Sequence, residues 1–142
     1  MNNQEQSLKL FVVLSKAYKA IMDGAVKNMK QHHFSETEFT VLELLYHKGR
    51  CPLQQIGSKI LITSGSITYN IDKLEKKGYI KRVQSADDRR ITFAEITEQG
   101  TALMDHVFPD HAEAIEQLTA SLNSEEKEQA ITLLKKLGRS SN

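Results

Sequence analysis

The chain has 142 residues, of which 39% are hydrophobic and 26% are charged, and its formal net charge is +1. This length suits one compact domain or one protomer of an interlocked oligomer. We find no leader-like N-terminus and no apolar run that could cross a bilayer, so we expect a cytoplasmic protein without a membrane partner. Because Cys51 is the only cysteine, an internal disulfide is excluded.

The charge is distributed unevenly along the chain. Residues 50–90 hold nine Lys/Arg and four Asp/Glu, a net charge of +5. Residues 95–128 hold nine acids and a single basic residue, Lys127. A basic segment in a nearly neutral chain indicates one surface that attracts a polyanion, while the rest of the molecule repels it.

Two helices are predicted before this basic segment. Apolar residues follow the helical period over residues 4–31, and no proline interrupts them. A helix of this length cannot bury its apolar stripe on a small lobe alone, so we expect part of it to pack on a partner chain. Ser35 and Glu38 form a capping-box pattern, which predicts a second helix that ends at Gly49. Residues 50–52 are expected to be a linker.

Residues 53–78 have the pattern of two short helices joined by a turn at 61–63. The second helix opens at residues 64–66, carries its apolar stripe on one face, and ends at Gly78. Its other face holds small, hydroxyl and cationic groups, which suit close approach to DNA. An ordinary solvated helix face fits this pattern equally well. The candidate DNA-contacting residues of this helix are Ser64, Gly65, Ser66, Thr68, Tyr69 and Lys73.

A β-hairpin is predicted directly after this helix. Residues 79–84 and 89–96 are rich in strand formers, and the segment between them is turn-forming. Arg89 and Arg90 lie at the tip, where arginine can enter the narrow minor groove of DNA. Asp88 can hold Arg90 in a fork, although a weak surface ion pair is the simpler alternative. A hairpin after a candidate recognition helix predicts a winged helix-turn-helix.

Two more helices are predicted after the hairpin. Thr97 can cap a long helix that Pro109 should kink, and Asn123 can cap a last helix that ends at Gly138. The predicted fold is therefore mainly α with a small β-hairpin wing. It consists of a winged lobe at about 35–97, flanked by dimerisation helices at about 4–31 and 98–138.

Two segments resemble the MarR family of bacterial transcription regulators. They are the wing signature, Asp-Asp-Arg-Arg at 87–90 with Thr-Glu-Gln-Gly at 97–100, and the helix end at residues 74–80. The resemblance extends over nearly the whole chain, 1–142, as a single domain, although Ile96 stands where leucine is commoner. It implies a homodimer on a pseudo-palindromic operator, with Arg90 in the minor groove and Asp88 orienting it.

The resemblance also implies control by a small molecule. Family members typically release DNA when a phenolic or quinone-like compound binds between the lobe and the dimer region. Residues 8–15 and 42–49 are similar to the subgroup that responds to hydroquinones. For each candidate taken alone, core or dimer packing is the simpler interpretation. The candidates for the ligand site are Phe11, Ser15, Tyr18, Phe39, Tyr46 and His47.

Other chemistries have little support in the sequence. The five histidines lack the spacing of helical metal ligands, and we find neither a glycine-rich phosphate loop nor a nucleophile–base arrangement. We therefore expect no metal, no cofactor and no enzymatic activity. Redox-sensing family members carry their thiol in the first helix, so a structural role is expected for Cys51.

The sequence thus predicts a sequence-specific DNA-binding transcription regulator, a homodimeric repressor released by a small aromatic compound. The alternative is a winged-helix module that docks a protein instead of DNA, since a fold alone does not determine function. Arg90 and the basic segment 50–90 favour DNA, because a protein-docking lobe needs neither.

Overall fold

The computed structural model describes residues 1–60 and 67–140. They form six α-helices and three short β-strands. The helices are α1 (Asn3–Gln31), α2 (Glu36–Lys48), α3 (Leu53–Lys59), α4 (Ile67–Lys76), α5 (Glu98–Leu118) and α6 (Ser124–Ser140). The strands are β1 (Arg50–Pro52), β2 (Ile80–Gln84) and β3 (Thr92–Ile96).

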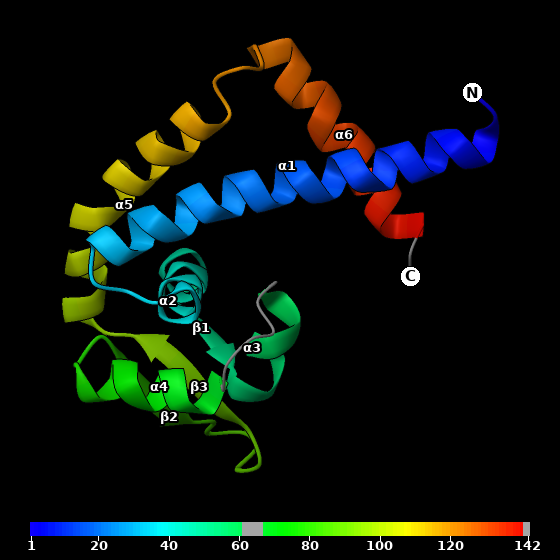
Figure 1. Cartoon of the computed structure of the whole chain (residues 1–142). Coiled ribbons are helices and arrows are strands. Elements are labelled where there is room, and N and C mark those ends of the chain that lie inside the picture. Colours follow the sequence, from blue (N-terminus) through cyan, green and yellow to red (C-terminus); the bar gives the residue numbers. More distant parts are fainter. Residues whose placement is uncertain (61–66, 141–142) are drawn as a thin grey trace.

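The elements form a lobe and a helical frame. The lobe contains α2, α3, α4 and the sheet, while α1, α5 and α6 form three sides of the frame above it (Figure 1). The β2–β3 hairpin extends from the lobe on the side away from α6. A winged helix-turn-helix lobe with a separate helical region is the predicted fold class, and the structure confirms it.

The hydrophobic core lies at the centre of the lobe and reaches α5. Helix α2 contributes the largest share, because its apolar residues at helical spacing face both the sheet and α5. Met104 and Val107 of α5 close the core from the frame side. Residues with no exposed surface include Phe39, Val41, Leu42, Leu45, Ile56, Leu74, Ala94 and Met104.

The predicted caps at the starts of three helices, and the predicted glycine at the end of α2, are present. Ser35 Oγ accepts from the Glu38 N–H, and Glu38 Oε1 accepts from the Ser35 N–H at 3.1 Å, which completes the capping box. Thr97 caps α5 and Asn123 caps α6 through their side-chain oxygens. Gly49 has a φ of 82°, a left-handed conformation that glycine adopts without strain.

Some predicted boundaries are wrong. The second strand of the hairpin, predicted over 89–96, begins only at Thr92. Residues 50–52 are not a linker but strand β1, which pairs antiparallel with β3, so that the sheet order is β1-β3-β2. Cys51 lies opposite Ala94 and is 2% exposed. Gly138 does not end the last helix, which continues to Ser140 because a glycine in a helix is tolerated at a small cost.

Helix α5 passes through Pro109 without ending. Its ribbon changes direction part-way along in Figure 1, as expected where a proline removes one backbone donor. Near this position α5 is joined to the end of α1. Asn28 Nδ2 donates to Asp110 Oδ2 at 3.1 Å, and His32 Nε2 lies 2.7 Å from the same oxygen.

The N-terminal half of α1 extends beyond the lobe, and its apolar side chains are exposed. Leu8 is 67% exposed and Phe11 is 68% exposed, whereas the buried residues of this helix are Ala25, Asn28 and Met29. Helix α6 likewise exposes large apolar side chains, among them Leu133 at 65%. Within the described part of the chain, no helix combines the length and apolar character needed to span a membrane.

Candidate DNA-binding surface and effector cleft

The described part of α4 begins at Ile67, so the candidate residues Ser64, Gly65 and Ser66, and the predicted turn at 61–63, lie outside the described residues. Ile71 and Leu74 are buried against the lobe, as their spacing predicts. Thr68 and Tyr69 lie on the exposed side, where Tyr69 is 63% exposed. This side of α4 therefore keeps a hydroxyl-bearing surface available to a partner.

Lys73 of α4 forms an ion pair that the sequence did not predict. It was assigned to the DNA-contacting face, but its Nζ lies 3.3 Å from Glu38 Oε1 on α2. Lys77 approaches the other oxygen, Oε2, at 3.0 Å. The pKa of Glu38 is lowered: burial alone raises it, but hydrogen bonds from Lys77 and Ser35 outweigh burial. Lys73 thus connects α4 to α2 through an ion pair within the lobe.

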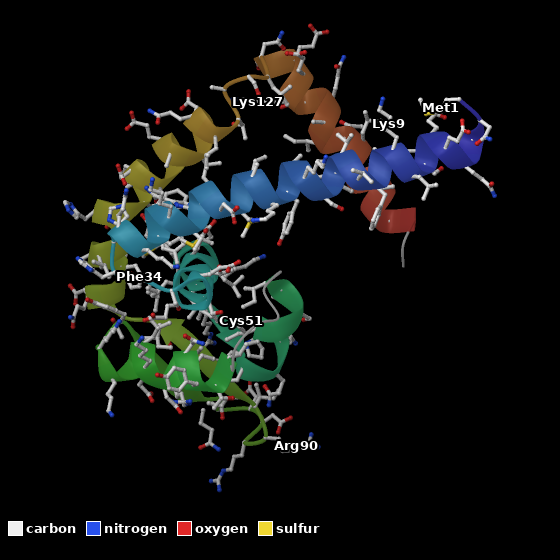
Figure 2. The ribbon with its side chains drawn as sticks, viewed as in Figure 1. Met1, Lys9, Phe34, Cys51, Arg90 and Lys127 are labelled. Atoms are coloured by element: carbon white, nitrogen blue, oxygen red, sulfur yellow. The ribbon has the colours of Figure 1, made fainter. Side chains whose placement is uncertain are left out.

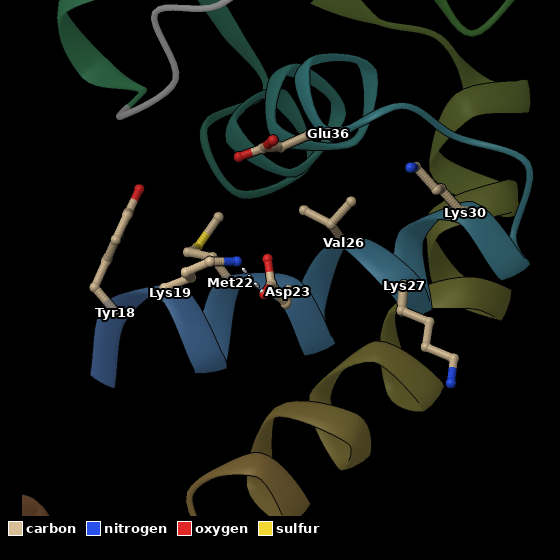
Figure 3. A pocket seen from close by; sticks show the side chains of 8 residues that line it. All are labelled: Tyr18, Lys19, Met22, Asp23, Val26, Lys27, Lys30 and Glu36. Carbon is tan, nitrogen blue, oxygen red and sulfur yellow. Dashed lines mark hydrogen bonds and ion pairs between the residues drawn. The ribbon is translucent and has the colours of Figure 1, made fainter. Parts of the chain in front are cut away.

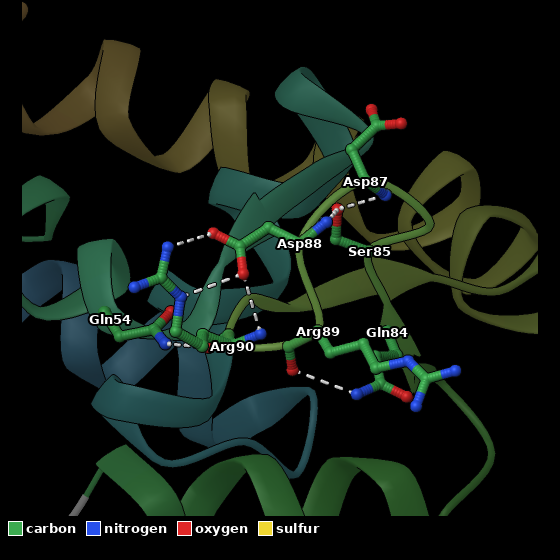
Figure 4. A network of polar contacts seen from close by, with 7 residues as sticks. All are labelled: Gln54, Gln84, Ser85, Asp87, Asp88, Arg89 and Arg90. Carbon is green, nitrogen blue, oxygen red and sulfur yellow. Dashed lines mark hydrogen bonds and ion pairs between the residues drawn. The ribbon is translucent and has the colours of Figure 1, made fainter.

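The wing tip is organised around Asp88 and Arg90. Arg90 Nε donates to Asp88 Oδ1 at 3.1 Å, and Arg90 Nη2 donates to Asp88 Oδ2 at 3.1 Å (Figure 4). The Arg90 backbone N–H also donates to Oδ1, at 3.0 Å. These bonds hold the pKa of Asp88 below its usual range and raise the pKa of Arg90. The predicted fork is present, and it leaves the Arg90 side chain 90% exposed.

Two glutamines brace the same tip. Gln84 Nε2 donates to the Arg89 carbonyl at 2.9 Å, and Gln54 Nε2 of α3 donates to the Arg90 carbonyl at 3.3 Å (Figure 4). Figure 2 places Arg90 at the end of the molecule farthest from Met1 and Lys127. The cationic tip is therefore carried outward on a hydrogen-bonded loop.

Arg82 of β2 makes contacts that sequence reasoning missed. Its guanidinium binds two carboxylates of α4, Asp72 and Glu75, which are three residues apart. Asp72 and Glu75 are three residues apart and so share one helix face. Together with an arginine in the following strand, this spacing was the sequence signal that could have predicted the ion pairs. The arginine and the two acids meet only because β2 packs beside α4, and this packing is a tertiary feature that the sequence pattern does not specify.

The six candidate ligand residues do not form one site. Phe39 is fully buried, with its ring centroid 4.5 Å from that of His111, so it belongs to the core. Tyr46 donates to Asp105 Oδ1 at 2.5 Å. His47 lines a hollow of about 300 Å³ beside Lys59 and Ile60. Phe11 and Ser15 are exposed on α1.

Tyr18 alone among them borders a larger cleft. This cleft has a volume of about 560 Å³ and lies between α1 and the start of α2 (Figure 3). Tyr18, Met22 and Val26 point toward the helix that carries Glu36. Lys19 also lines the cleft and lies 2.8 Å from Asp23 Oδ2. Tyr18, Met22 and Val26 are its uncharged lining residues, and the other lining residues are charged: Lys19, Asp23, Lys27, Lys30 and Glu36.

The comparisons with known proteins agree with this geometry. The model of the MarR family matches residues 34–92. The transcriptional regulator MhqR of Bacillus subtilis is 54% identical over 94% of this chain and 92% of its own. The chain belongs to the MarR family. As a member of it, the chain is a DNA-binding transcription regulator, and its relatives are regulators rather than enzymes.

Solved structures show the same fold at lower identity. A MarR family regulator from Streptomyces coelicolor, in complex with DNA, superposes with a TM-score of 0.84 and 18% identity over 100% of this chain and 94% of that one. A MarR variant from Escherichia coli, complexed with operator DNA, gives 0.79 and 17% identity over 96% and 99%. The fold of this MarR-family chain is thus one that also occurs in complexes with DNA.

Proposed function

We propose that the chain forms a homodimeric repressor, each protomer a single domain that places α4 in the major groove and the wing in the adjacent minor groove. The observation that carries this proposal is the Asp88–Arg90 fork. It presents a guanidinium already oriented at an exposed tip, so little side-chain entropy is lost on binding. Thr68, Tyr69 and Arg89 contact DNA beside it.

The uncovered helices support a second copy of the chain as partner. The apolar side chains of α1 and α6 lie on the frame, away from the wing (Figure 2). Contiguous exposed apolar surface of this kind marks an interface. Two identical chains pack such surfaces around a two-fold axis, and the same symmetry makes the operator pseudo-palindromic.

The cleft beside Tyr18 is the proposed effector site. A phenolic or quinone-like ring fits against Met22 and Val26, and the lysines at the rim favour an ionised hydroxyl or carboxylate. The cleft touches both α1 of the frame and α2 of the lobe. A ligand there releases DNA only by binding more tightly to the arrangement in which the two lobes do not fit the operator.

A binding titration tests the DNA proposal. Duplex DNA from the region upstream of the protein's own gene is titrated at several salt concentrations, and the protected bases are mapped by footprinting. Two lobes that each neutralise several phosphates should give a slope of log affinity against log salt on the order of −4 or steeper. A flat response, with no protected palindrome, would favour the alternative of a protein-docking module.

A further inference from the structure

Arg82 of β2 connects the wing to helix α4 by hydrogen bonds. Its Nη2 donates to Asp72 Oδ1 at 2.5 Å, and its Nη1 donates to Glu75 Oε1. The backbone N–H of the same arginine donates to Glu75 Oε2 at 3.2 Å. Three hydrogen bonds from one residue therefore connect the middle of β2 to one face of the recognition helix.

The position of β2 explains why these bonds are available. The strand lies at the edge of the sheet, and its partner β3 pairs Ala94 with Arg82 on the other side. An edge strand has backbone groups without a neighbouring strand. Glu75 occupies this edge in place of a strand, so α4 is attached to the wing by backbone as well as by side chain.

The geometry makes this contact stronger than an ordinary surface ion pair. An isolated exposed pair contributes little, but a planar guanidinium that binds two carboxylates at once gives a defined orientation. The Arg82 side chain is only 30% exposed, while those of Glu75 and Asp72 are 39% and 60% exposed. The guanidinium is thus partly shielded from water, while both carboxylates are exposed.

We propose that Arg82 is a positioning residue for DNA binding, which sets the spacing between the recognition helix and the wing tip. The major and minor grooves of B-DNA have fixed widths, so α4 and Arg90 fit adjacent grooves only when their separation is correct. Arg82 lies between them, three residues before the tip turn begins at Ser85. This inference rests on DNA binding by the same surface and specifies how that surface is held.

A double-mutant cycle tests the proposal. Arg90→Ala is measured in the wild-type background and in the Arg82→Met background, with the footprinted duplex as the probe. In wild type, the loss of Arg90 should reduce affinity about 10-fold or more. Without Arg82 the tip is no longer held at the groove, so the same substitution should reduce affinity by less than about 3-fold.

Two controls separate positioning from charge. Lys81→Met removes a cation from an exposed neighbour on the same strand, and Arg90→Ala should keep its full effect in that background. Arg82→Lys retains the charge, but an ammonium group cannot bind Asp72 and Glu75 through a planar pair of donors. In this background the loss of affinity caused by Arg90→Ala should therefore recover only part of its wild-type size. Equal factors for Arg90→Ala in the wild-type and Arg82→Met backgrounds would overturn the proposal, as would full recovery by lysine.

A second variant addresses the case in which Arg82→Met fails to fold. Asp72→Asn combined with Glu75→Gln removes both carboxylates and leaves the arginine in place. The same reduced effect of Arg90→Ala is expected in this background. Failure of the wild-type protein to bind any duplex would instead count against the proposed operator, so the two failures are distinguishable.

Discussion

Lys77 Nζ of the recognition-helix end lies 3.0 Å from Glu38 Oε2, and Glu38 in turn caps the first turn of α2. The Glu38 side chain is 2% exposed, whereas that of Lys77 is 36% exposed. One buried carboxylate therefore holds the start of α2 and the end of the recognition helix together. Lys73 binds the same carboxylate, which leaves it less free for phosphate.

Glu38→Gln should lower the free energy of unfolding by about 1–3 kcal/mol, because charge-assisted bonds are replaced by weaker ones. The folded-state pKa of Glu38 lies below its ordinary value of 4.5. The stability that its charge supplies is therefore present above that value and is lost as the pH falls through the lower, folded-state pKa. Urea unfolding between pH 7 and pH 3 should show the difference between variant and wild type shrinking in acid. Glu36→Gln, in the same turn, is the matched control and should show neither effect.

Arg90→Ala should weaken binding to the footprinted duplex far more than Arg139→Ala. Arg90 is held at the wing tip, whereas Arg139 lies in the last turn of α6. The expected loss for Arg90 is about 10-fold or more, with a smaller salt slope. Fluorescence anisotropy at two salt concentrations measures both quantities. If the two variants lose equal affinity, the wing has no special role.

Deletion of residues 2–20 should abolish the dimer and specific DNA binding together. The buried residues of α1 all lie beyond this segment, so the lobe keeps its core. Phe11→Glu should act in the same direction, since it places a charge in the proposed interface, while Gln6→Glu is the control on the same helix. Light scattering at micromolar concentration gives the molar mass. A monomeric full-length chain would contradict the proposed architecture.

A hydroquinone or salicylate-type compound should release the protein from DNA through the cleft beside Tyr18. Release should also occur in Cys51→Ser, because Cys51 is 2% exposed and its thiol lies 3.6 Å from the Pro52 carbonyl oxygen. Tyr18→Ala should raise the concentration needed, and His47→Ala, which lines the separate hollow, should not. Release from wild type alone would make Cys51 a quinone-reactive sensor. Release from neither protein would reject this class of effector.

Signals contained within a few residues of sequence were sufficient for much of the molecule. The caps at Ser35, Thr97 and Asn123 join atoms three residues apart, and the Asp88–Arg90 fork joins atoms two residues apart. Such contacts form wherever the local backbone permits, so periodicity and residue type predict them. The wing and the family membership followed from the same short patterns.

Tertiary packing decided the rest. The strand at Cys51 exists only because β3, more than 40 residues later, lies beside it, and short strands carry no independent signal. Lys73 binds Glu38 because that carboxylate lies 3.3 Å away across a helix interface. Phe39 lies in the core because α5 packs against it. Arg82 binds Asp72 and Glu75 because the edge of a strand meets a helix there. Each of these contacts depends on which surfaces of the molecule pack together. Helical periodicity and turn residues predict the individual elements and their faces, but not which faces meet.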